Sequence, residues 1–191
     1  MNRTTWPLKG TRPPTAGIGW SPRTVLATLP ADLRQWVNEA TLVGWILEIV
    51  CDALEGYSPA PAFVADGPPV PMMLTALTYC YATGRYASED IEAATAADRT
   101  IHYLCMHQFV TASAIRRFRR AHRALIHSCL TSLHRKAWRH RFGGPPSGCQ
   151  SSAESSRLAD SDDDRFAYRL AAAAEEKIQQ AILADTIALD D

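Results

Sequence analysis

Apolar residues recur every three or four positions through the first regular part of this 191-residue chain. The recurring positions after Pro30 are Leu33, Trp36, Val37, Ala40, Val43, Leu47, Val50, Cys51 and Leu54. This spacing matches a helix that buries one stripe, which we expect Thr41 and Gly44 to divide into two shorter helices. No stretch alternates apolar and polar residues for long enough to predict a strand. The chain is therefore expected to be all-α, as a compact multi-helix bundle.

Later segments carry the start and stop signals of further helices. Residues 71–84, PMMLTALTYCYATG, predict a helix that ends near Gly84. Ser88 is predicted to cap the next helix, because its hydroxyl can accept an orphan backbone N–H. Thr111 or Ser113 is predicted to cap an arginine-rich helix that continues as far as the breaker sequence GGPPSG.

Composition divides the chain into four parts. Hydrophobic residues make up 47% of the whole, which is enough for a folded core. Residues 1–24 predict a flexible, disordered basic arm, and residues 25–141 predict the helical domain. Residues 142–164 are rich in serine and aspartate and predict a flexible acidic linker. Residues 165–189 predict a helical tail, on propensity.

Charge is segregated along the chain although its formal net charge is zero. Residues 1–29 carry four Lys/Arg and no acid, and residues 30–98 carry two basic and ten acidic residues. Residues 99–141 hold ten Lys/Arg, all six histidines and no Asp or Glu, whereas residues 150–191 carry four basic and ten acidic residues. Such asymmetry indicates a polyanionic partner at the basic block, or neutralisation of that block by the acidic ones.

Within the basic block, residues 113–125, SAIRRFRRAHRAL, place five arginines in one predicted helix. One face of that helix is expected to be apolar, with Ile115, Phe118, His122, Leu125, Ile126 and Cys129. Arg116, Arg120 and Arg123 fall on the opposite face, with Arg117 and Arg119 beside them. Like charges one turn apart repel mildly, so either neighbouring carboxylates or phosphates should offset the repulsion.

The order of residues 71–122 resembles the N-terminal domain of DDE-type insertion-sequence transposases of the InsH-like group. The matching positions are Pro71, Leu74, Tyr79, Tyr81, Gly84, Ser88, Ile91, Glu92, Ile115, Phe118, Arg119 and His122. The upstream segment LPADLRQWVNEAT is similar to the family's opening, so the resemblance covers about residues 25–138.

The resemblance implies a helical domain that helps to bind the terminal inverted repeats of the element and contributes to dimer assembly. The DNA-contact residues that it implies are Arg116, Arg117, Arg119, Arg120 and Arg123, with Arg135, Lys136 and Arg139 as secondary ones. Two positions depart from the family pattern: Glu89 stands where arginine is usual, and Val110-Thr111 replaces a Pro-Asp pair.

The catalytic signature of such transposases is not found in this sequence. They use three separated carboxylates to hold two metal ions, whereas residues 99–149 contain no carboxylate and Asp162, Asp163 and Asp164 are consecutive. A solvated linker is the expected role of those three residues. We therefore expect no enzymatic activity and no cofactor.

Other chemistry is weakly indicated. The candidate zinc ligands are His102, Cys105, His107, His122, His127 and Cys129. Their spacing matches no familiar zinc signature, so no metal site is expected. Trp138 is the one aromatic residue expected to touch a partner, with a capping contact at its helix end as the alternative. The absence of a long apolar run and the unpaired cysteine pattern predict a cytoplasmic protein with no membrane segment.

Taken together, the sequence predicts a truncated, transposase-like helical domain that binds double-stranded DNA at element ends without strand transfer and takes no small-molecule substrate. One alternative is a protein-interaction module that pairs with itself or with a full-length transposase and regulates it. A second alternative is a non-functional remnant whose acidic tail covers its basic face.

Overall fold

The computed structural model describes residues 29–55, 57, 68–142 and 153–190, and all regular structure in these ranges is helical. The elements are η1 (Leu33–Gln35), α2 (Glu39–Leu54), α3 (Val70–Ala82), α4 (Ser88–Ala97), α5 (Arg99–Leu104), α6 (Ala112–Ala121), α7 (Arg123–Phe142) and α8 (Ala153–Asp190). The all-α prediction is confirmed. The predicted basic arm at residues 1–24 lies outside the described residues.

The first periodic segment breaks at a cap and not at its glycine. A short 3₁₀ turn, η1, is followed by α2, which begins after Asn38. The Asn38 side chain accepts a hydrogen bond from the backbone N–H of Thr41 at 2.9 Å, which satisfies one orphan donor of the new helix. Gly44 lies inside α2, so the break that we expected there is wrong.

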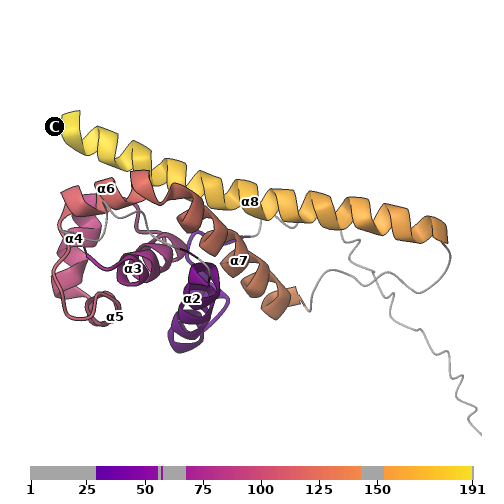
Figure 1. The fold of residues 1–191 in the computed structure, drawn as a ribbon, viewed down its shortest axis with the longest axis horizontal. Helices are drawn as coiled ribbons and strands as arrows, with labels where there is room; N and C mark the ends of the chain where they lie inside the picture. The colour runs from indigo at the N-terminus through magenta and orange to yellow at the C-terminus, as the bar shows by residue number, and fades with distance from the viewer. Residues whose placement is uncertain (1–28, 56, 58–67, 143–152, 191) are drawn as a thin grey trace, which may run out of the picture.

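Helix α3 forms the centre of the bundle. Every residue from Met72 to Ala82 is buried, which is typical of a helix that has neighbours on all sides. It packs against α2, α5, α7 and α8, and Figure 1 shows it beneath α8. The predicted stop is confirmed: α3 ends at Ala82, and Gly84 follows with a φ of +82°, a conformation that favours glycine.

Helix α4 is capped from a distant part of the chain. Ser88 is the first helical residue and not the cap that we expected, because the cap position belongs to Ala87. The backbone N–H of Ser88 instead donates to a carboxylate oxygen of Asp185 on α8 at 2.8 Å. The Ser88 hydroxyl donates to the other oxygen of the same carboxylate, also at 2.8 Å.

The arginine-rich segment forms two helices where one was expected. Thr111 caps α6, as predicted, by accepting from the backbone N–H of Ala114 at 3.3 Å. The helix then ends at Ala121, and His122 leaves helical geometry before α7 begins. The apolar face is confirmed: Ile115, Phe118, His122, Ile126 and Cys129 are buried, and Leu125 is half-buried.

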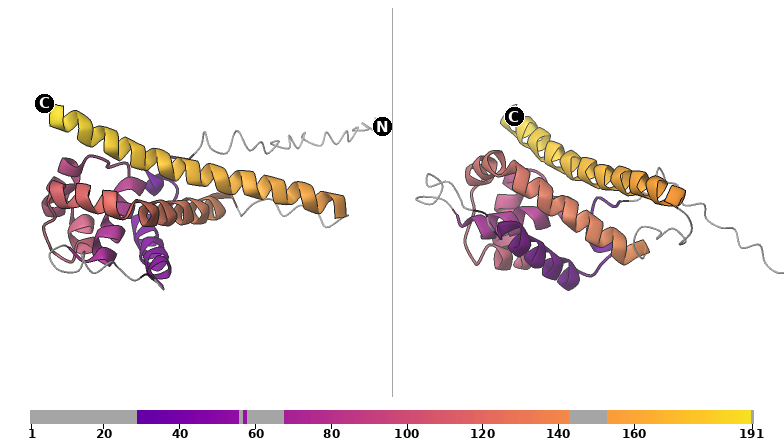
Figure 2. Two further views of the ribbon diagram at one scale, coloured as in Figure 1. Left: turned by 45° about the horizontal axis from the view of Figure 1, so that its top comes forward. Right: turned by 45° about the vertical axis from the view of Figure 1, so that its right-hand side comes forward.

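The C-terminal part of the chain differs most from our expectation. Residues 153–164 belong to α8 and are not a linker, because one continuous helix begins at Ala153. Extending an existing helix costs little once its alanine-rich part has formed. Figure 1 and Figure 2 show α8 lying along α7 and across the helices beside it, with its N-terminal part extending past the end of α7.

Helix α8 belongs to the core and is not a separate tail. Its buried residues recur at helical spacing: Phe166, Leu170, Ala174, Ile178 and Ala181. The last three join the main hydrophobic cluster, whereas Phe166 and Leu170 pack with Trp138. The helical domain therefore extends beyond residue 141.

Candidate nucleic-acid interface

Half of the eight predicted DNA-contact residues form ion pairs within the molecule. The pairs are Arg116 with Glu89, Arg119 with Asp185, Arg123 with Glu175, and Lys136 with Glu48. The carboxylates come from α4, α8 and α2, which are the acidic blocks on either side of the basic one. Intramolecular neutralisation therefore accounts for part of the positive charge.

Arg119 is buried, so our expectation that it faces outward is wrong. Its side chain is 4% exposed, and its guanidinium donates to Tyr81 Oη at 3.0 Å, to Ser88 Oγ at 3.3 Å and to Asp185. Arg119 lies one helical turn after the buried Ile115, which turns it toward the core. A buried charge needs such partners, because its desolvation is costly.

Burial also affects the tyrosine in this polar cluster. Loss of water raises the pKa of Tyr81 to about 12, although the adjacent Arg119 acts in the opposite direction. Tyr81 therefore keeps its proton at neutral pH and stays neutral. This polar cluster joins α6 to the start of α4 and to the C-terminal part of α8.

The other three ion pairs lie at the surface. The hydrogen bond from Arg116 lowers the pKa of Glu89, so this departure from the family pattern holds Arg116 against α4. The side chains of Arg123 and Glu175 are 44% and 37% exposed, and Lys136 also lies 5.7 Å from the ring centroid of Trp45. Exposed pairs of this kind contribute about 0–1 kcal/mol each.

The remaining four predicted residues are exposed and free of such pairs. Arg117 and Arg120 lie on α6, and Arg135 and Arg139 lie on α7. None of the four forms an ion pair with a carboxylate in the part of the chain that the structure describes. They are the predicted contact residues that the fold leaves available to an external anion.

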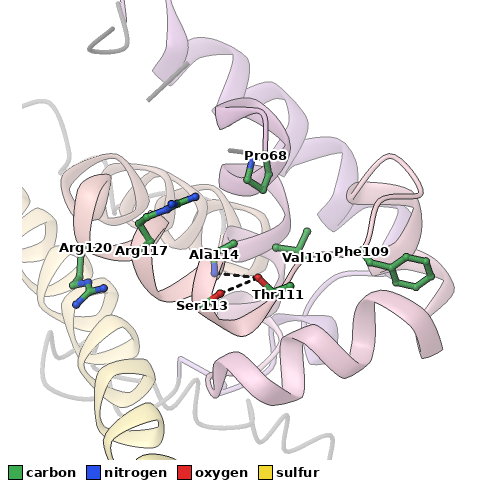
Figure 3. A pocket seen from close by; sticks show the side chains of 8 residues that line it. All are labelled: Pro68, Phe109, Val110, Thr111, Ser113, Ala114, Arg117 and Arg120. Carbon is green, nitrogen blue, oxygen red and sulfur yellow. Dashed lines mark hydrogen bonds between the residues drawn. The ribbon is translucent and has the colours of Figure 1, made fainter. Parts of the chain in front are cut away.

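Two of these arginines line a pocket of about 430 Å³ at the start of α6. Its lining residues are Pro68, Phe109, Val110, Thr111, Ser113, Ala114, Arg117 and Arg120. Figure 3 shows Phe109 at one end, Arg120 at the other, and the hydroxyls of Thr111 and Ser113 between them. None of these described lining residues carries a carboxylate, so their combination of guanidinium groups and hydroxyls suits a phosphate or another oxyanion.

The predicted partner contact of Trp138 is wrong. Its side chain is 2% exposed and stacks on Phe142, with 3.9 Å between the ring centroids. It also makes edge contacts with Trp36 and Phe166. These aromatic residues join η1, α7 and α8, so Trp138 contributes to packing.

Two of the histidines among the candidate zinc ligands contact backbone carbonyl oxygens. His102 Nδ1 lies 2.8 Å from the carbonyl oxygen of Thr95, and His127 Nε2 lies 3.0 Å from that of Ala171. Burial raises the pKa of the Cys105 thiol to about 11, which keeps it protonated at neutral pH. Among the described residues, no group of three His, Cys, Asp or Glu side chains could hold a metal ion.

A second hollow, of about 590 Å³, is mainly apolar and lies between α2, α3 and the end of α5. Its walls include Leu47, Leu54, Met72, Tyr103 and Met106. Tyr103 and Met106 are 63% and 53% exposed. Its described lining residues include no arginine, which distinguishes it chemically from the pocket at α6.

Comparison of the chain with known protein families, with curated proteins and with solved structures finds no match. In the described part of the chain, no helix has both the length and the apolar character needed to cross a membrane.

Sequence reasoning missed the carboxylates that complete the ion pairs, and it missed Phe109. Asp185 carries no local signal of its role, because its partners Ser88 and Arg119 are 97 and 66 positions away. Glu89 was noted only as a departure from the family pattern. The inward position of Arg119 could have been inferred from its spacing to Ile115.

Proposed function

We propose that this protein binds double-stranded DNA through phosphate contacts from Arg117, Arg120, Arg135 and Arg139. The observation that carries the proposal is the set of exposed guanidinium groups on two successive helices without carboxylate partners in the described residues. Arginine suits this role because its planar fork matches a phosphate and its charge persists at any physiological pH. Each neutralised phosphate also releases condensed counterions, which favours association.

The ion pairs narrow the set of residues that can contact DNA directly. Arg119 is excluded as a contact because it is buried, and Arg116, Arg123 and Lys136 would have to exchange a carboxylate for a phosphate. Such an exchange gains less than engaging a free guanidinium. The resemblance to transposase N-terminal domains supports DNA as the polyanion, and the ends of an insertion element as the sequence bound.

Binding without strand transfer is part of the same proposal. Residues 99–149 contain no carboxylate, whereas the transfer chemistry of such transposases uses three. The absence of enzymatic activity stays a prediction, which incubation with a labelled duplex and Mg²⁺ or Mn²⁺ would check.

The test compares two triple variants that remove equal charge. Arg117→Ala, Arg120→Ala and Arg139→Ala remove free guanidinium groups, whereas Arg116→Ala, Arg123→Ala and Lys136→Ala remove paired cations. Fluorescence anisotropy with a labelled duplex at low salt measures the Kd of each. We expect the first variant to bind at least about tenfold more weakly than the second, because only it loses direct phosphate contacts.

Equal affinities of the two triple variants would contradict the proposal, since binding would then follow total charge and not these contacts. Undetectable binding of the unmodified chain at low salt would reject DNA binding itself. Circular dichroism and thermal unfolding of both variants serve as the control for folding.

The apolar hollow between α2, α3 and α5 favours one second candidate, a protein-interaction module that regulates a full-length transposase or another copy of the chain. Tyr103 and Met106 expose apolar surface at its edge. Size-exclusion chromatography with light scattering would detect association, and Met106→Asp should weaken it. A monomer at all concentrations, alone and with the full-length enzyme, would exclude this candidate.

A further inference from the structure

The pocket at the start of α6 also presents an aromatic side chain that its phosphate contacts do not require. Phe109 is 73% exposed. Its ring lies beside the ring of His102, which in turn contacts the ring of His107. The next residue, Val110, is buried, and Thr111 caps α6. The backbone that follows Phe109 is therefore anchored, whereas the Phe109 ring is exposed at the surface.

The loop that carries Phe109 has an unusual backbone. Met106 and His107 both adopt the left-handed region, with φ values of 49° and 61°, where glycine is favoured. The backbone N–H of His107 donates to the carbonyl of His102 at 2.9 Å, and that of Gln108 donates to Cys105 at 2.9 Å. Strain of this kind persists where the surroundings fix it, and such positions cluster at functional sites.

The two ends of the pocket have complementary chemistry. Figure 3 shows Phe109 at one end, whereas Arg117 and Arg120 lie toward the other. An aromatic face stacks on any nucleobase, and guanidinium groups track the strand's phosphates. In an intact duplex the bases are stacked on one another, so Phe109 could reach only a base that has left the stack or has no partner strand.

We propose that this pocket receives the unpaired extension next to a bound duplex, with one base against Phe109 and the phosphates of neighbouring nucleotides on Arg117 and Arg120. The inference rests on the proposed DNA binding and adds its substrate class, which is a duplex with a single-stranded extension. The pocket volume of about 430 Å³ leaves room for part of such a strand.

An acidic peptide is the competing occupant, because its carboxylates could also pair with arginine. The aromatic end favours nucleic acid, because a base can stack on the exposed face of Phe109. An aspartate or glutamate side chain would leave that face without a partner. The pocket wall also offers the hydroxyls of Thr111 and Ser113, which commonly donate to phosphate oxygens in DNA complexes.

The experiment measures one ratio, the Kd for a blunt duplex divided by the Kd for the same duplex with a short single-stranded extension. Anisotropy is recorded for the unmodified chain, Phe109→Ala, Phe109→Trp and Tyr168→Ala. Tyr168 is the matched control, because it is an aromatic residue on α8 that is 75% exposed and lies outside the pocket lining. A glutamate-rich peptide is added as a competitor in a parallel series.

We expect a ratio of about ten or more for the unmodified chain, since one stacked base contributes tenfold to hundredfold in affinity. The ratio should fall to near one in Phe109→Ala and persist in Phe109→Trp and Tyr168→Ala. A ratio near one in the unmodified chain, or a ratio that survives Phe109→Ala, overturns the inference while duplex binding stands. If the glutamate-rich peptide displaces the extended duplex from the unmodified chain but not from Phe109→Ala, the pocket binds a protein ligand and the inference is overturned. Failure to bind either DNA rejects the proposed function instead.

Discussion

Arg119 and Arg120 are neighbours in the sequence with opposite environments. Arg119 is buried against Asp185, whereas Arg120 is exposed at the α6 pocket. Successive residues on a helix point about 100° apart, so one arginine can serve the core while the next serves the surface. Charge density along a sequence therefore overstates the charge that a partner can reach.

The first prediction concerns Asp185. Replacing it in Asp185→Ala leaves the Arg119 guanidinium buried without its carboxylate and removes the acceptor of two Ser88 hydrogen bonds. We expect a loss of about 3–5 kcal/mol in the free energy of unfolding, measured with urea. The control is Glu175→Gln, which breaks the exposed pair with Arg123 and should cost about 1 kcal/mol or less. Equal losses would show that the Asp185 pair is not desolvated.

At the residue level, helix caps and apolar faces could be predicted because their signals are local. Thr111 as a cap and Ile115 and Phe118 as core residues depend only on spacing and side-chain chemistry. The roles of Asp185 and Trp138 could not be predicted, because they depend on residues that are brought close only by the complete fold.

At the scale of elements, α8 decides how the molecule is built. Its apolar stripe fits against α3 and α7, yet its sequence shows mainly alanine propensity and acidic charge. Propensity predicted the helix at residues 165–189 correctly, but it could not predict docking, because alanine contacts are small and depend on a partner surface. The start of α8 is rich in serine and aspartate, and this composition by itself predicts a linker. The prediction is wrong there because the segment continues into a strong helix former and joins the same helix.

The second prediction tests whether α8 is part of the core. Ile178 is completely buried among core residues, whereas Ile187 is 57% exposed on the same helix. Ile178→Ala should cost about 2–5 kcal/mol in unfolding free energy because it leaves a cavity. Ile187→Ala, the same substitution at the surface, should stay within about 0.5 kcal/mol. If α8 were a separable tail, both variants would unfold at the same urea concentration as the unmodified chain.

The third prediction concerns the interface of α7 and α8 in acid. Burial, followed by the charge of Lys177, lowers the pKa of His134 to about 4, below the ordinary value near 6.5. The unfolded chain therefore takes up this proton first as the pH falls. Stability that is fully present above about pH 6.5 should decline by up to about 3 kcal/mol as the pH falls to 4.

His134→Leu removes that proton uptake and should flatten the decline between these pH values. His122 retains some pH dependence in the variant, because burial lowers its pKa as well. Urea unfolding at a series of pH values gives the comparison. An unchanged slope in His134→Leu would mean that His134 can be protonated in the folded protein.

For the whole molecule, the ion pairs lower the effective charge of the basic block. Of the ten cations at residues 99–141, four are neutralised by Glu48, Glu89, Glu175 and Asp185. The acidic blocks therefore neutralise part of the basic block within the folded molecule, which is one of the two outcomes that the charge segregation indicates. The family resemblance could suggest which residues are basic and helical, but not which of them remain accessible.

The fourth prediction uses this difference. If only Arg117, Arg120, Arg135 and Arg139 contact phosphates, the slope of log K against log salt should be about −3 to −4. Contacts from all eight predicted residues would give about −7. Titrations of one labelled duplex at several salt concentrations measure the slope, and Arg120→Ala should reduce its magnitude by about one. A slope near −7 would mean that DNA displaces the internal carboxylates.

The contact between Ser88 and Asp185 also has a consequence for synthesis on the ribosome. These residues lie 97 positions apart, and α8 follows every other described helix along the chain. Translation proceeds at about 5–20 residues per second, so the buried Arg119 waits several seconds for its counter-charge. During that interval Arg119 and Arg123 lack their carboxylate partners, which both lie on α8, and the core residues that α8 covers stay exposed. Docking of α8 is thus the last step in the assembly of the described helices.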